Sequence, residues 1–276
     1  MDKKIIFKYA GGEFDLSRRT VVMGILNVTP DSFSDGGRYI QPENAFSQAI
    51  NMINSGAGII DVGAQSTKPG CVKISAEEEW ARLEPVLRRL VSETYAVISV
   101  DTFYPEVAHR ALACGAHIIN DVSGRPSIGM LSAVKEFGAG YILMHSGNGA
   151  ASDECSFDDV RTFLVDKKAQ LVRAGIAPQS ICLDPGIGFG NSREVDREIV
   201  RRLGEIVSVC GESAVLIGAS RKRVTATRSD DNAAGRMPAT IAINTAAQMN
   251  GARIIRVHDV REGVLAARMM DKILFY

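Results

Sequence analysis

The sequence lacks several features that would point to common classes of function. Only 6% of its 276 residues are aromatic, and there is a single tryptophan. The 32 basic and 32 acidic residues leave no net charge, so no long-range field attracts nucleic acid or an anionic membrane. No apolar run reaches the roughly 18 residues that indicate a membrane span, and the first residues show no signal-peptide pattern. We therefore expect no nucleic-acid partner and no membrane partner.

Cysteine is too scarce and too scattered to suggest a disulfide framework. The chain has five cysteines, an odd number, and none of them forms a C-x-x-C pair. Cys182 lies inside an apolar run, as a buried thiol would. This usage is typical of reduced thiols and argues against a cysteine-based zinc site. We expect a cytoplasmic protein.

The chain does contain a repeated pattern of eight apolar, β-branched runs, each followed by a polar or glycine-containing tip. The runs cover residues 21–28, 57–62, 96–100, 117–122, 140–144, 180–183, 214–217 and 253–257. Between consecutive runs the chain is long enough for a helix. The helical patterns cover residues 43–54, 76–92, 105–114, 127–137, 157–174, 193–209, 236–250 and 261–273. This alternation predicts parallel strands connected by helices.

The number of runs and the position of their polar tips favour a closed barrel. An open doubly wound sheet gathers its ligand groups at one switch point, whereas here polar residues follow all eight runs. We therefore predict an α/β fold, a (β/α)8 TIM barrel forming one domain over residues 1–276. Residues 5–9 and 13–16, joined at Gly11-Gly12, predict a short β-hairpin within residues 1–17 that could plug the bottom of the barrel.

The longest motif is Met-Gly-Ile-Leu-Asn-Val-Thr-Pro-Asp-Ser-Phe-Ser-Asp-Gly-Gly at residues 23–37. It resembles a signature of the dihydropteroate synthases. Later stretches resemble further blocks of that family in the same order, at residues 61–70, 99–102, 118–122, 143–145, 183–190, 220–222 and 256–260. Members of the family are TIM barrels. They join 6-hydroxymethyl-7,8-dihydropterin diphosphate to 4-aminobenzoate and release diphosphate, so the resemblance implies a transferase of folate biosynthesis.

Three strand tips carry groups suited to a reduced pterin, which presents ring nitrogens, an amine and a carbonyl along one edge. Asp101 and Asp184 directly follow two of the runs, and Asn120 lies near the end of a third. A carboxylate accepts from two adjacent N–H groups, while an asparagine both donates and accepts. The family uses the matching positions to bind the pterin. Lys222 could cover the pterin face as a cation and reach the second substrate.

Other tips suit a diphosphate. Arg256 and His258 lie two residues apart after the last run, and both side-chain types donate to phosphate oxygens. The resemblance implies that they form an anion site with Asn27, which would bind Mg²⁺ bridging to the diphosphate. Thr67 and Lys68 of the second loop are also assigned to the diphosphate.

The resemblance places the 4-aminobenzoate site between the first two loops that follow strands. It assigns six residues there: Phe33, Thr67, Pro69, Phe189, Ser220 and Lys222. It further implies a largely dissociative substitution at the exocyclic carbon of the pterin. In that reaction Asp101, Lys222, Arg256 and His258 stabilise charge, and Asp35 closes over the cation with the first loop.

The sequence departs from the family pattern in loops near the second substrate. Gln65 and Lys68 replace a common glutamate and arginine, and residues 144–149 and the stretch from Arg223 also differ. A non-catalytic or specialised pterin-binding paralogue is therefore an alternative. A methyltetrahydrofolate-binding methyltransferase is a second one, but methyl transfer has no diphosphate for Arg256 to bind. The family also implies a homodimer formed through helices away from the active-site rim.

Overall fold

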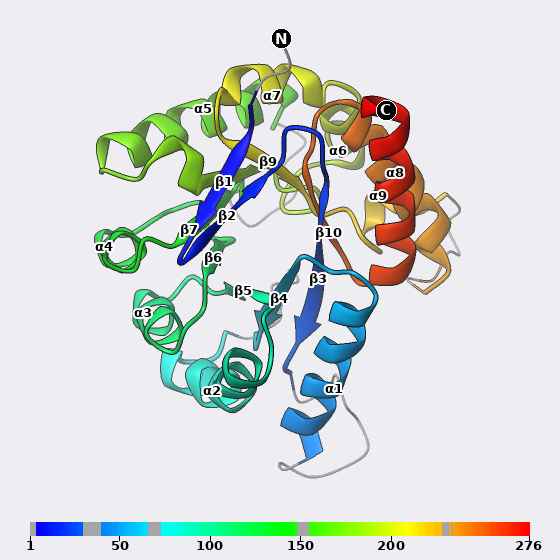
Figure 1. The fold of residues 1–276 in the computed structure, drawn as a ribbon. Helices are drawn as coiled ribbons and strands as arrows, with labels where there is room; N and C mark the ends of the chain where they lie inside the picture. The colour runs from blue at the N-terminus through cyan, green and yellow to red at the C-terminus, as the bar shows by residue number, and fades with distance from the viewer. Residues whose placement is uncertain (1–3, 30–39, 66–72, 148–154, 228–231, 233) are drawn as a thin grey trace.

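We describe a computed structural model of the chain at residues 4–29, 40–65, 73–147, 155–227, 232 and 234–276 (Figure 1). Eight parallel strands close into a barrel, because β10 pairs with both β9 and β3. The strands are β3 (Val21–Asn27), β4 (Ile59–Gly63), β5 (Val97–Asp101), β6 (Ile118–Asp121), β7 (Gly140–Met144), β8 (Ile181–Asp184), β9 (Ala214–Ile217) and β10 (Ile254–Val257). The predicted (β/α)8 barrel is confirmed, and each strand ends within one residue of its predicted end.

Helices surround the barrel (Figure 1). They are α1 (Ile40–Asn54), α2 (Ala76–Glu93), α3 (Pro105–Ala113), α4 (Ile128–Glu136), α5 (Phe157–Arg173), α6 (Arg193–Arg201), α7 (Leu203–Cys210), α8 (Met237–Met249) and α9 (Val260–Phe275). Their inner faces pack on the strands in one large apolar core. Among the described residues, no helix is both long enough and apolar enough to cross a membrane.

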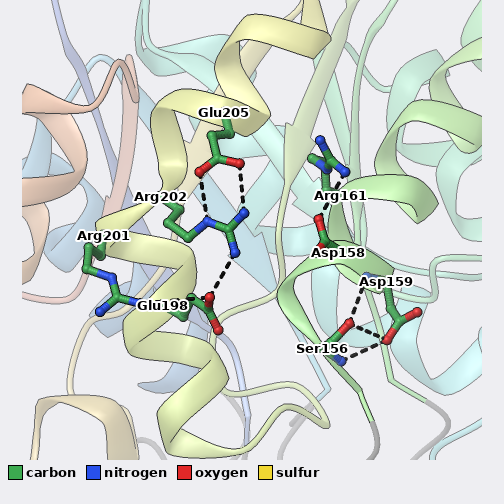
Figure 2. A network of polar contacts seen from close by, with 8 residues as sticks. All are labelled: Ser156, Asp158, Asp159, Arg161, Glu198, Arg201, Arg202 and Glu205. Carbon is green, nitrogen blue, oxygen red and sulfur yellow. Dashed lines mark hydrogen bonds and ion pairs between the residues drawn. The ribbon is translucent and has the colours of Figure 1, made fainter.

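The prediction of one helix over residues 193–209 is wrong. The backbone leaves helical geometry at Arg202, which has φ −103° and ψ 15°, and the helix-weakening Gly204 follows two residues later. The Arg202 guanidinium stabilises this break because it forms ion pairs with both α6 and α7. It bonds Glu198 of α6 at 2.8 Å and Glu205 of α7 at 2.7 Å (Figure 2).

The predicted hairpin is present as antiparallel strands β1 (Ile6–Tyr9) and β2 (Gly12–Asp15). It lies across one end of the barrel (Figure 1). Phe7 and Leu16 are fully buried in a cluster with side chains from the starts of the barrel strands, among them Val21, Ile59 and Ile118. The hairpin therefore plugs the bottom of the barrel, as predicted.

The barrel strands run from an apolar floor to a polar rim. The floor consists of the hairpin cluster, whereas Asp101, Asp121 and Asp184 are the last residues of β5, β6 and β8. Parallel strands bring their C-terminal ends to the same rim. The fold therefore collects these carboxylates at the end of the barrel opposite the hairpin.

Candidate active site

The rim is organised around Arg256 of β10, which lies between two carboxylates. Its Nε donates to Oδ2 of Asp61 at 2.7 Å, and its Nη2 donates to Oδ2 of Asp101 at 3.0 Å. The three residues come from β10, β4 and β5, and Asp61 is fully buried. Buried charges are stable only when they are paired in this way.

Asn120 joins the same cluster from β6, where it is the register neighbour of Asp101. Its Nδ2 donates to Oδ2 of Asp61 at 3.1 Å. Asp61 therefore orients both Asn120, which is predicted to bind the pterin, and Arg256, which is predicted to bind the diphosphate. Its second oxygen, Oδ1, has no hydrogen-bond partner among the described residues.

Asp61 is a polar residue near the end of the run at residues 57–62, and it opens the block at residues 61–70. The sequence indicated no role for it. What the sequence could not supply was the pairing across the barrel. Asp61 and Arg256 are 195 residues apart in the chain.

Asp184 is held by a tight turn at the end of β8. Its Oδ1 accepts from the backbone N–H of Gly186 at 2.8 Å. Gly186 has φ +73°, and a Cβ there would lie 1.9 Å from the carbonyl oxygen of His145. Only glycine fits at that position, so the Pro-Gly after Asp184 serves to orient its carboxylate.

Lys222 approaches from the loop after β9. Its Nζ donates to the carbonyl oxygen of Ile187 at 2.6 Å and lies 4.3 Å from the centroid of the Phe189 ring. The charge of Asp184 favours the ammonium form of Lys222. Lys222 is therefore held beside the Phe189 ring, within the electrostatic influence of Asp184.

The loop carrying Phe189 is fixed by a close contact between two glycines. The N–H of Gly147 donates to the carbonyl oxygen of Phe189 at 3.0 Å. A Cβ on Gly190, which has φ +86°, would lie 2.8 Å from Cα of Gly147. The departure from the family pattern at residues 144–149 therefore still provides the small residue that this contact needs.

Burial shifts the protonation of the charged groups in this cluster. It raises the pKa of Asp101 to about 7, although the Arg256 guanidinium opposes the shift. It also raises the pKa of Asp184. It lowers the pKa of Lys222 to about 8, against the opposing effect of Asp184. Such shifts concentrate where groups are used for binding or catalysis.

His258 and Ser220 contact each other rather than standing apart at two sites. Oγ of Ser220 lies 3.0 Å from Nδ1 of His258 and accepts from its backbone N–H at 3.2 Å. The sequence analysis assigned Ser220 to 4-aminobenzoate and His258 to the diphosphate. The two assignments therefore fall on residues that are in direct contact.

The turn that holds Ser220 has an unusual backbone. Arg221 has φ +59° and is the one non-glycine residue with positive φ within the described ranges. Its N–H donates to Oγ1 of Thr240 at 3.2 Å, and its guanidinium pairs with Asp259, which follows His258. Strained residues of this kind persist at functional sites because surrounding contacts hold them.

The second loop is closed at its base by Gln65. Its Oε1 accepts from the backbone N–H of Ile74 at 2.7 Å, and the Tyr104 hydroxyl donates to the Ile74 carbonyl at 2.6 Å. A glutamine supplies this acceptor as well as a glutamate would, so the departure at Gln65 keeps the hydrogen bond to Ile74, which precedes α2. Five predicted site residues lie outside the described residues: Phe33, Asp35, Thr67, Lys68 and Pro69.

Asn27 ends β3 with an exposed side chain at the same rim. The described residues contain no group of three His, Cys, Asp or Glu side chains able to hold a metal ion. Mg²⁺ commonly takes only one or two protein oxygens and completes its octahedron with phosphate and water oxygens. A single amide oxygen at this rim fits that donor set when a bound phosphate supplies further oxygens.

Taken together, the rim can read the polar edge of a flat heterocycle and bind an anion beside it. Asp101, Asn120 and Asp184 supply acceptors and a donor, and Lys222 supplies a cation. Arg256 and His258 supply the groups that bind phosphate oxygens.

Comparisons with known proteins give one consistent result. A family model described as pterin binding enzyme matches residues 23–258. A dihydropteroate synthase of Escherichia coli is 40% identical over 96% of this chain and 95% of its own length. The solved dihydropteroate synthase of Xanthomonas albilineans with 4-aminobenzoic acid superposes with a TM-score of 0.93 and 35% identity, covering 99% of this chain and 100% of that one.

A plant relative is longer than this chain. The mitochondrial folate synthesis bifunctional protein of Pisum sativum is 42% identical over 98% of this chain. The match covers 56% of the pea protein, so this chain corresponds to about half of it.

Proposed function

The chain belongs to the family of pterin binding enzymes, and on that premise we propose that it is a dihydropteroate synthase. It condenses 6-hydroxymethyl-7,8-dihydropterin diphosphate with 4-aminobenzoate to give 7,8-dihydropteroate and diphosphate. The observation that carries this conclusion is the shared cluster at the rim. There Asp101 and Asn120, which suit a pterin, meet Arg256, which suits a diphosphate, through the buried carboxylate of Asp61.

The pterin binds along the carboxylates. Asp184 and Asp101 accept from its ring N–H and amine groups, and Asn120 pairs with the remaining donor and acceptor positions. Lys222 lies over the ring face. Hydrogen bonds with Gly186, Asp61 and Ile187 hold Asp184, Asn120 and Lys222, which supports this proposal.

The diphosphate leaves against positive charge. Arg256 and His258 donate to its oxygens and stabilise the charge that develops as the carbon–oxygen bond breaks. Asn27 would hold Mg²⁺, whose contribution when bound is to neutralise further charge on the leaving group. Thr67 and Lys68 are proposed to add contacts from the second loop.

The electron-rich dihydropterin delocalises the positive charge left at the exocyclic carbon, and the Asp101 carboxylate balances it. Asp35 is proposed to close over this cation with the first loop and exclude water. The amine of 4-aminobenzoate then attacks the carbon and releases a proton. Its ring is proposed to lie near Phe189, with Phe33, Thr67, Pro69 and Lys222 completing the slot.

Purified protein mixed with the pterin diphosphate, Mg²⁺ and 4-aminobenzoate tests this function. We expect diphosphate to be released in the same amount as dihydropteroate is formed. Chromatography measures the dihydropteroate, and a coupled assay measures the diphosphate. Tight pterin binding with no turnover would instead identify a non-catalytic pterin-binding protein. Methyl transfer from a methylated folate would identify a methyltransferase.

We also propose that the protein works as a homodimer in the cytoplasm. An apolar stripe on α9 supports the dimer: Leu265, Met269 and Ile273 recur every four residues and are more than half exposed. Water-exposed apolar side chains in a row are typical of a protein interface. Cys114, Cys155 and Cys182 form no disulfide with any described residue, which supports a reducing compartment.

A further inference from the structure

Ser220 makes two contacts with His258 at the rim. Its Oγ accepts from the backbone N–H of His258 at 3.2 Å and lies 3.0 Å from Nδ1 of the same residue. Ser220 is only 3% exposed. Since the oxygen already accepts one N–H, its own proton is available to donate, and Nδ1 is the acceptor within reach.

The charge state of His258 makes the position of its proton matter. Burial, and then the cations Arg221 and Arg256, lower its pKa to about 4, while Asp259 opposes the shift. The imidazole is therefore neutral near pH 7 and carries one N–H. A proton on Nδ1 would leave a lone pair on Nε2, which repels phosphate oxygens, whereas a proton on Nε2 donates to them.

The contact between the two residues is built into the fold on both sides. Arg221, next to Ser220, pairs with Asp259, next to His258, with Nε and Oδ2 3.1 Å apart. The N–H of Arg221 is also fixed by Thr240. The loop after β9 and the start of α9 are thus tied together at the point where Oγ meets Nδ1.

We propose that Ser220 is a positioning residue that holds neutral His258 in the tautomer protonated on Nε2, so that Nε2–H donates to the diphosphate. This inference rests on the proposed function for the identity of the anion. It assigns Ser220 to the diphosphate side of the reaction through His258. Contact with the carboxylate of 4-aminobenzoate is the competing role.

Nitrogen NMR on the ¹⁵N-histidine-labelled protein tests the tautomer directly. The chain has four histidines, and a His258→Gln sample identifies the signals of His258. We expect its Nδ1 to give the shift of an unprotonated acceptor and Nε2 that of an N–H, with and without inorganic diphosphate and Mg²⁺. Ser220→Ala should give a mixture of tautomers, and Ser220→Thr, which keeps the hydroxyl, should restore one. A protonated Nδ1 in the unmodified protein would overturn the proposal.

Kinetics test the consequence. In Ser220→Ala we expect the KM for the pterin diphosphate to rise about tenfold, the value of one good hydrogen bond, with an unchanged KM for 4-aminobenzoate and recovery in Ser220→Thr. A rise confined to the KM for 4-aminobenzoate would overturn the proposal in favour of the competing role. If the protein makes no dihydropteroate at all, the proposed function fails, and the NMR result alone decides the role of Ser220.

Discussion

At the scale of single residues, Arg256 has two tasks. It balances the buried carboxylates Asp61 and Asp101, and it is proposed to bind the leaving diphosphate. The first task is structural: it keeps the carboxylates in place, so its loss should change the affinity for every ligand at the rim alike. The second acts only on ligands that carry phosphate, so the two tasks can be separated by comparing ligands.

We predict that Arg256→Ala lowers affinity for the pterin diphosphate by about two orders of magnitude, because a desolvated charged contact is lost. Affinity for the 6-hydroxymethyl pterin without diphosphate should fall far less. Isothermal titration with each ligand measures the difference, and Arg256→Lys, which keeps the charge but not the planar fork, should give an intermediate loss. Equal losses for both ligands would show that Arg256 has no specific role toward the anion.

The pH dependence of the reaction follows from two shifted groups. Asp101, with a pKa of about 7, is a carboxylate above that pH, and Lys222, with a pKa of about 8, is an ammonium ion below that pH. Since both charged forms are needed, kcat/KM for the pterin diphosphate should rise as pH passes 7 and fall as it passes 8.

A guanidinium stays charged throughout this range, so Lys222→Arg is the matched test. It should remove the fall on the alkaline side and leave the rise on the acid side, whatever its effect on the maximal rate. Initial rates at saturating 4-aminobenzoate give both profiles. An alkaline fall that persists in Lys222→Arg would assign it to another group.

Residue identity at the rim was predictable, but residue partnership was not. The alternation of apolar runs and polar tips placed Asp101, Asn120 and Asp184 on one rim. Nothing local to the sequence indicates that Asp61 would hold Asn120 and Arg256, or that Ser220 would face His258. The contact of Asp61 with Arg256 joins strands 195 residues apart and depends on closure of the barrel. Ser220 and His258 follow the neighbouring strands β9 and β10, and their contact depends on the conformation of the two loops.

At the scale of elements, strands were easier to predict than helix continuity. A buried strand of a parallel barrel is apolar on both faces, so its ends show clearly in the sequence. The helical periodicity of residues 193–209 continues through Arg202, yet α6 ends and α7 begins there. Ion pairs of Arg202 with Glu198 and Glu205 stabilise the break, and the hydrophobic periodicity does not show them (Figure 2).

The β1–β2 hairpin carries a prediction about stability. Phe7 is fully buried in the barrel floor, so Phe7→Ala should lower the free energy of unfolding by about 3–5 kcal/mol through lost burial and a residual cavity. Lys8→Ala, at the exposed neighbouring position, should change it by less than about 0.5 kcal/mol. Urea unfolding measures both.

The activity of Phe7→Ala tests whether the barrel floor also contributes to the active site. Since the hairpin closes the end of the barrel opposite the rim, Phe7→Ala should keep its KM values at a temperature where it remains folded. If Phe7→Ala lowers the free energy of unfolding by less than about 1 kcal/mol, the floor packs without Phe7. A changed KM at full folding would mean that the floor and the rim are coupled.

At the scale of the whole molecule, the barrel separates stability from chemistry. Its floor is apolar and sealed by the hairpin, and its outer helices pack on the strands. The rim instead buries charged groups that serve ligand binding. Burial shifts the pKa of Asp101, of Asp184 and of Lys222. The outer surface of α9 belongs to neither region, because its apolar stripe faces solvent.

That stripe is the basis of the last prediction, the proposed homodimer. Met269→Glu places a charge in the middle of the stripe and should convert a dimer to a monomer, since an unpaired charge buried in an interface costs several kcal/mol. Ile128→Glu, at the exposed apolar start of α4, is the matched control and should leave the dimer intact. Sedimentation velocity measures both masses. A wild-type monomer would refute the homodimer, and a dimer that survives Met269→Glu would place its interface elsewhere. Pterin affinity should be the same in both variants, because α9 presents this stripe away from the rim.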